Sequence, residues 1–260
     1  MSRQSLLPGL GGITIFLAIW ELLIVGGIFQ FEYLPAPSRI AIGLVGMLRS
    51  GSVIVEIAHT LAATIIGWLI AMVVGVTAGA ILGLSQTARR YSLASIEVLR
   101  PLPAVAFIPV ALLLFGFSLQ TELFVIVIPS LWLVLVNTMG GVAAVSQRLQ
   151  DVTRVFRMSP IDAVSKVYIP AAAPAVLVGC RLSMTLALVL AIVAEMVGNP
   201  EGLGYAVVRE AQALQPEMMF GYIFITGLLG VGLNALIIGL SALILPGEFL
   251  RLSIEWEQAR

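Results

Sequence analysis

Long runs of apolar residues dominate this chain and limit what it can fold into. Of its 260 residues, 60% are hydrophobic and 11% are charged, and the mean hydropathy is +1.07. Soluble domains are about half apolar and about a quarter charged, so lipid must cover much of this surface. Because about 20 apolar residues cross a bilayer core as a helix, the sequence predicts an all-α, polytopic transmembrane bundle.

Six segments have the length and composition of spanning helices, with the whole chain, 1–260, forming one membrane domain. The prolines Pro101, Pro103 and Pro109 predict that the third of these helices is kinked or starts late. No small-residue cleavage site follows the first run, which is therefore predicted to be a span and not a removed signal peptide. The six segments lie at about residues 10–29, 53–84, 102–117, 123–142, 174–197 and 220–245.

A short interfacial helix is expected between the first two spans. The break Leu34-Pro35-Ala36-Pro37 ends the first apolar run, and Ser38 follows it as a candidate helix cap. The helix is predicted to end near Arg49.

The basic residues predict the orientation of the chain. If the N-terminus is inside, most Lys and Arg side chains lie in the inside segments, so the positive-inside rule predicts both termini in the cytoplasm of a bacterial inner membrane. The inside segments carry Arg3, Arg89, Arg90, Arg100, Arg148, Arg154, Arg157, Lys166, Arg251 and Arg260, and the outside segments carry Arg39, Arg49 and Arg209.

A stripe of small residues follows one face of the second span. Its members recur every four residues, at Gly67, Ala71, Gly75, Gly79 and Gly83. Small side chains let helices approach closely within lipid. Packing inside one subunit and packing between subunits are equally compatible with this pattern.

The segment 146–170 interrupts the membrane pattern and is polar enough to lie in the cytoplasm. Leu149, Val152 and Phe156 fall on one helical face. Ser159-Pro160-Ile161-Asp162 then has the form of a helix start, with a serine cap, a proline at the first position and an acid three residues after the cap. The pattern fits two short amphipathic helices that contact another protein, and equally a loop lying on lipid headgroups.

This segment resembles the signature loop of binding-protein-dependent ABC importer permeases, in which Glu-Ala-Ala, then Gly, then Ile or Leu followed by Pro recur at fixed spacing. Here Asp151-Val152-Thr153 stands at the first position and Ile169-Pro170 at the last, without a gap. Arg157 stands where the family has Gly, which leaves the geometry of the turn between the two helices open.

Further short matches, in the same order along the chain, resemble the nitrate, sulfonate and taurine permease group. They cover most of the sequence. They are Trp20-Glu21-Leu22, Leu34-Pro35-Ala36-Pro37-Ser38, His59-Thr60-Leu61, Leu99-Arg100-Pro101-Leu102-Pro103, Phe107-Ile108-Pro109, Phe115-Gly116, Asn137-Thr138, Ala194-Glu195-Met196 and Gly202-Leu203-Gly204-Tyr205.

The resemblance implies a type I ABC importer permease fold, working as a pair of copies with two ATPase subunits and an external substrate-binding protein. The chain has no Gly-x-x-x-x-Gly-Lys-Ser/Thr loop, so it is expected to be a transport subunit and not an enzyme. ATP and Mg²⁺ would bind the partner ATPase, and this chain would bind no cofactor or metal. The residues expected to couple to the ATPase are Asp151, Val152, Arg154, Val155, Phe156, Arg157, Ser159, Pro160, Asp162 and Ala163.

Charged residues within spans are costly and suggest function. Arg181 could attract an anion in the pathway or could be paired or snorkelling, and Glu195 could be structural or part of a gate; Asn137 joins them as a candidate pathway residue. Glu21 could pair with a base or lie at a subunit interface. His59, the only histidine, is expected to be a polar anchor, since the sequence shows no partner ligands for a metal.

The expected cargo is a small anion such as a sulfonate, taurine or nitrate. The alternatives are an ATP-independent secondary transporter or channel, and a membrane enzyme. Matched halves with broken helices would favour the first. A convergent catalytic set would favour the second, and the sequence shows neither.

Overall fold

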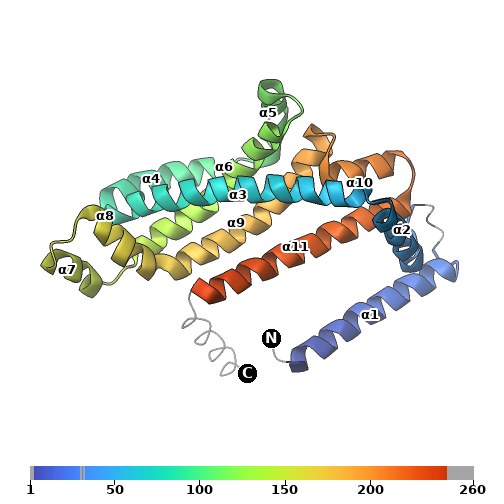
Figure 1. Ribbon diagram of the computed structural model, residues 1–260, viewed down its shortest axis with the longest axis horizontal. Coiled ribbons are helices and arrows are strands. Elements are labelled where there is room, and N and C mark those ends of the chain that lie inside the picture. Colours follow the sequence, from blue (N-terminus) through green and yellow to red (C-terminus); the bar gives the residue numbers. More distant parts are fainter. Residues whose placement is uncertain (1–2, 30, 32, 245–260) are drawn as a thin grey trace.

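The computed structural model describes residues 3–29, 31 and 33–244, and all the regular secondary structure of that part of the chain is helical (Figure 1). The elements are α1 (Arg3–Val25), α2 (Pro37–Ser50), α3 (Ser52–Leu84), α4 (Gln86–Leu99), the 3-10 turn η1 (Ala104–Phe107), α5 (Ile108–Phe115), α6 (Leu119–Ala143), α7 (Gln147–Val155), α8 (Pro160–Ala163), the π-helical turn η2 (Val164–Tyr168), α9 (Ile169–Gly198), α10 (Gly202–Gln212) and α11 (Pro216–Ile244).

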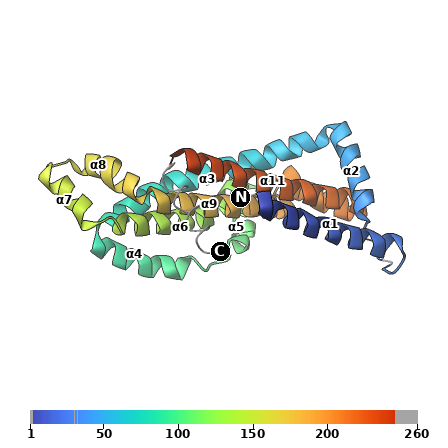
Figure 2. The ribbon, with the colours of Figure 1, turned by 90° about the horizontal axis from the view of Figure 1, so that it is seen from below.

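The molecule is elongated, and its two ends differ. Helices α3, α6 and α9 pack together lengthwise as the core, while α11 lies against α9, α10 and α2. Helices α7 and α8 form one end, and α2 and α10 lie toward the other (Figures 1 and 2). These are called the α7–α8 end and the α2–α10 end below.

The stripe of small residues on α3 packs within the subunit. A Cβ added at Gly67 would lie 2.6 Å from Ile126 of α6, and one at Gly79 would lie 2.7 Å from the carbonyl oxygen of Leu135. The stripe therefore lets α3 and α6 approach closely, which settles the alternative that the sequence left open in favour of packing inside one subunit.

Four helices, at Ser52–Leu84, Leu119–Ala143, Pro160–Gly198 and Pro216–Leu243, are long and apolar enough to cross a membrane. The third predicted span is different, because α5 covers only Ile108–Phe115 and is bent by 75° from α4. Pro101 and Pro103 lie at that break and cannot donate backbone hydrogen bonds. The bent pair has the form of a broken span or of a re-entrant loop, and Gly11–Val25 of α1 is a shorter apolar stretch. The described residues therefore hold four or five candidate spans, where the sequence predicted six.

The cap predicted at Ser38 is wrong. Helix α2 begins at Pro37, and Ala36 is its N-cap residue without a side-chain hydrogen bond. Ser38 lies inside the first turn, and its backbone N–H and hydroxyl donate to the Glu21 carboxylate at 3.0 and 2.7 Å. The Glu21 carboxylate of α1 thus accepts hydrogen bonds from the first turn of α2, where the helix cannot pair its own N–H groups. The spacing of residues in the sequence does not reveal this contact.

Candidate functional site

An exposed apolar surface lies at the α7–α8 end. Val155, Phe156 and Ile161 are 79%, 74% and 81% exposed. Val152 is partly exposed, whereas Ala163 is buried against the body of the chain. Of the apolar side chains predicted to contact a partner, Val152, Val155 and Phe156 are thus accessible and Ala163 is not; Ile161, which was not predicted, adds to the exposed surface.

Arg157 takes the place of a glycine in the turn after α7. Its φ is +47°, in the left-handed region. The Arg157 N–H donates to the Arg154 carbonyl at 3.0 Å, and the Met158 N–H donates to the Thr153 carbonyl, also at 3.0 Å. These two bonds form a Schellman motif with Arg157 at the position that glycine usually fills. Arg157 therefore adopts the left-handed conformation that glycine usually supplies at this position of the motif.

Ser159 caps the second helix as the sequence predicts. Its Oγ accepts from the Asp162 N–H at 3.2 Å and donates to the Asp162 carboxylate at 2.6 Å. Pro160 is the first helical residue. Asp162 also pairs with Lys166, and Asp151 pairs with Arg154 at 3.2 Å. The polar residues of this segment thus pair with one another and fix its local shape.

Within the described residues, no hydrogen bond or ion pair joins the three candidate pathway residues. Arg181 of α9 is exposed, and its Nε donates to Asn234 of α11 at 3.1 Å. Asn137 donates to Leu133 of its own helix at 2.7 Å. Glu195 lies fourteen residues beyond Arg181, or about 21 Å along α9.

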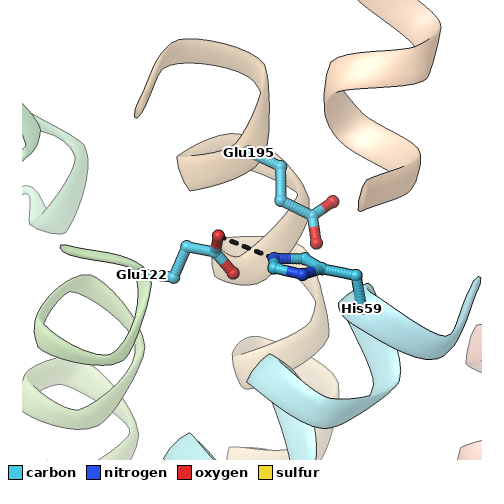
Figure 3. A group of neighbouring side chains, drawn as sticks. All are labelled: His59, Glu122 and Glu195. Atoms are coloured by element: carbon cyan, nitrogen blue, oxygen red, sulfur yellow. Dashed lines mark hydrogen bonds and ion pairs between the residues drawn. The ribbon is translucent and has the colours of Figure 1, made fainter. Parts of the chain in front are cut away.

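Glu195 is instead part of a polar cluster at the α2–α10 end. Figure 3 shows Glu195 of α9, Glu122 of α6 and His59 of α3 pointing toward one another. The His59 Nε2 lies 3.0 Å from a Glu122 oxygen, and its Nδ1 lies 3.0 Å from Glu201. The Asn199 amide contacts both Glu122 and His59. Three packed helices and the loop after α9 therefore converge on one imidazole.

The start of α10 is held by side chains from two other helices. The N–H groups of Gly202, Leu203 and Gly204 donate to Glu56, Thr60 and Glu195 at 2.8, 2.9 and 2.8 Å. These are the backbone donors that a helix cannot satisfy by itself. A Cβ at Gly202, whose φ is +89°, would lie 2.3 Å from the Glu195 carboxyl group. The Gly-Leu-Gly motif thus lets α10 rest directly on Glu195.

Arg209 joins α10 to the same end of the bundle. Its guanidinium bonds Glu56 at 3.1 Å, Glu210 at 3.0 Å and the Tyr222 hydroxyl at 3.2 Å. Burial acts to lower the pKa of Arg209, but the hydrogen bonds that it donates to Glu210 and Glu56 outweigh burial, so the pKa is raised. Arg209 therefore stays charged and links α3, α10 and α11 through its guanidinium contacts.

Sequence reasoning missed Glu122, which is fully buried. The residue lies in the first turn of α6, one position before the predicted start of that span at about residue 123. The predicted boundaries therefore placed Glu122 outside the span. A start at Leu119 would have placed a charge within the span and made Glu122 a candidate.

The fold is that of an ABC importer permease. An inward-facing structure of the MetNI methionine ABC transporter superposes with a TM-score of 0.63 over 72% of this chain and 93% of its own, at 17% identity. A chain of an amino acid ABC transporter superposes with a TM-score of 0.57 over 77% of this chain and 96% of its own, at 19% identity.

The chain belongs to the family of binding-protein-dependent transport system inner membrane components, whose model matches residues 71–248. The putative aliphatic sulfonates transport permease protein SsuC of Bacillus subtilis is 29% identical over 228 residues, covering 88% of this chain and 83% of its own. The nitrate import permease protein NrtB of Synechococcus elongatus is 28% identical over 256 residues, covering 94% and 91%. The bicarbonate transport system permease protein CmpB of Synechocystis is 29% identical over 259 residues, covering 95% and 91%.

This protein is therefore a multi-pass inner membrane permease of a binding-protein-dependent ABC importer, and not itself an enzyme. Such permeases work with an ATPase and a binding protein. The resemblance inferred from the signature loop and the ordered short matches is confirmed.

Proposed function

We propose that two copies of this chain form the pathway for a small anion, with an ATPase docked on the α7–α8 end of each copy and a binding protein at the α2–α10 end. Both termini then lie in the cytoplasm. The observation that carries the proposal is the exposed apolar surface of Val155, Phe156 and Ile161. Covering this surface with a protein groove lowers the free energy of the complex.

The shape of the segment supports a protein partner over lipid headgroups. Helix α7 projects beyond the ends of the core helices (Figure 1). Its turn is fixed by the Schellman bonds at Arg157 and Met158, and the next helix is fixed by the Ser159 cap. A rigid, preorganised surface loses less conformational entropy on docking. In this proposal, the closing ATPase pair binds ATP and Mg²⁺ and moves the segment as a lever.

Arg181 supports an anionic cargo. It is the only Lys or Arg in α3, α6, α9 and α11. Its partner Asn234 lines a groove of about 440 Å³ between α9 and α11, together with Thr185 and Met184. The relatives named for sulfonates, nitrate and bicarbonate all take anions. A guanidinium beside such a groove would bind a planar or tetrahedral oxyanion by charge-assisted hydrogen bonds.

Replacing Phe156 with Asp tests the docking surface. The chain would be co-expressed with the ATPase subunit of its importer and purified in nanodiscs, with Phe156→Leu as the matched control. A charge in an apolar groove costs several kcal/mol, so Phe156→Asp should lose the ATPases while Phe156→Leu keeps two per permease pair. Normal ATPase binding by Phe156→Asp would show that this segment is not the dock.

Replacing Arg181 with Gln tests the cargo class separately. Uptake of radiolabelled taurine, nitrate and bicarbonate would be measured in proteoliposomes that hold the whole importer. We expect Arg181→Gln to reduce uptake of the accepted anion at least about tenfold, with ATPase binding unchanged, and Arg181→Lys to retain part of it. Equal uptake by all three proteins would remove Arg181 from the pathway.

A further inference from the structure

The polar cluster at the α2–α10 end has the composition of a metal site, and this property is independent of transport. We propose that His59, Glu122 and Glu195 bind a divalent transition-metal ion of the Zn²⁺ type. The ion ties α3, α6 and α9 together where the three helices end.

The donor atoms are of the right kind and lie close together. The three residues offer one imidazole nitrogen and two carboxylate oxygens, and these atoms all lie within 4.8 Å of one another. Around a tetrahedral Zn²⁺ with bonds of about 2.0 Å, ligand atoms lie about 3.3 Å apart. Small rotations of the two glutamate side chains close that difference. Mixed nitrogen and oxygen ligands favour zinc and its neighbours over Ca²⁺ or Mg²⁺.

Two carboxylate oxygens in the cluster are buried without a partner. Glu122 is 0% exposed and Glu195 is 1% exposed. Within the described part of the chain, Glu122 Oε2 and Glu195 Oε1 have no hydrogen-bond partner. Buried carboxylates are unfavourable unless a cation or hydrogen bonds compensate them. A doubly charged ion between Glu122 and Glu195 would compensate both.

The surrounding groups hold the donors as outer-sphere groups do in metal sites. His59 reaches Glu201 through Nδ1 at 3.0 Å, which directs Nε2 into the cluster. The Gly204 N–H holds one oxygen of Glu195 at 2.8 Å and leaves the other available. Such carboxylate–histidine and backbone contacts orient ligands and fix the imidazole tautomer. A 180° flip of the Asn199 side-chain amide would direct its oxygen, in place of its nitrogen, toward the proposed ion as a fourth donor.

An ion can reach this site from the surface. The His59 side chain is 18% exposed, and the neighbouring Glu201 is 66% exposed. The entrance therefore carries a carboxylate that attracts cations, while the two inner glutamates lie behind it.

Metal content of the purified full-length chain tests the proposal. The protein, with its affinity tag removed, would be stripped with a chelator in nanodiscs, exposed to Zn²⁺, desalted and measured by mass spectrometry of the metal. We expect one Zn²⁺ per chain, and at least tenfold weaker binding in His59→Ala and Glu122→Gln. Glu21→Gln, which removes a carboxylate that bonds Ser38 on another helix pair, should bind normally.

A spectroscopic readout separates a ligand from a residue that only supports the fold. His59→Cys loaded with Co²⁺ should show a thiolate-to-cobalt charge-transfer band. The wild-type chain, whose buried Cys180 lies outside the cluster, should not show it. The proposal is overturned if the wild type retains no metal, if all variants retain the same amount, or if His59→Cys gives no band. Any of these results would leave the cluster as an ion-pair network without metal.

Discussion

The two ends of this molecule are built in opposite ways. The α7–α8 end is made by one continuous stretch, and its hydrogen bonds and ion pairs join residues at most five positions apart. The α2–α10 end is assembled from α3, α6, α9 and the loop after α9, and its central bond joins residues 63 positions apart. The first end exposes apolar side chains, whereas the second buries charged ones.

This difference assigns different physical roles to the two ends. A local segment with an exposed surface can be moved as a unit, because few contacts tie it to the core. The other end joins three core helices through buried polar groups, so it cannot change without affecting all of them. Substitutions at the α7–α8 end should therefore act on docking or local order, and those at the α2–α10 end on global stability.

The largest expected effect comes from Gly202, where α10 rests on Glu195. In Gly202→Ala, the new Cβ would lie 2.3 Å from the Glu195 carboxyl group, and φ is +89°. Strain and overpacking each cost about 1–3 kcal/mol, so the free energy of unfolding should fall by about 2–4 kcal/mol. Urea unfolding in detergent micelles, followed by circular dichroism, measures this change.

Gly227→Ala is the matched control for this substitution. Gly227 lies within α11, and its added Cβ would meet nothing within 4 Å. Helix propensity then predicts no loss, and a gain of up to about 1 kcal/mol. If the two alanine variants unfold alike, α10 does not depend on its contact with Glu195, and the contrast between the two ends fails.

The same contrast explains what the sequence revealed. The Ser159 cap, the short helices around it and four of the six predicted spans follow from local spacing, and the structure agrees with these. The partners of His59 and the role of Glu21 at the start of α2 depend on helices that meet only after folding. Glu122 was missed because the predicted start of α6 was a few residues late.

Replacing Arg157 with Gly should produce a smaller effect of the opposite sign. Arg157 holds a left-handed φ of +47°, which costs a non-glycine residue about 1–2 kcal/mol. The greater freedom of glycine in the unfolded chain offsets part of that gain. We expect the turn to be stabilised by about 0.5 kcal/mol. Hydrogen exchange of the Met158 amide, which bonds Thr153, should slow by about twofold.

Arg154→Gly controls for the loss of a positive charge. Arg154 lies in the last turn of α7 with helical geometry, so glycine there should weaken the helix by about 1 kcal/mol. Faster exchange in both variants would mean that Arg157 is not strained. Arginine at position 157 would then stabilise the turn more than glycine does.

The smallest effect should come from Asp151, and it sharpens the comparison most directly. Asp151 and Arg154 form an exposed pair at 3.2 Å, and such pairs contribute less than about 0.5 kcal/mol and fade with salt. Asp151→Ala should therefore change amide exchange in α7 only slightly.

Glu56→Ala also removes one carboxylate, at the other end of the molecule, where Glu56 accepts hydrogen bonds from both Gly202 and Arg209. Because it leaves partly buried donors unpaired, it should lower the free energy of unfolding by about 1–3 kcal/mol. Equal small losses at both sites would mean that the polar contacts of α10 are as dispensable as a surface ion pair.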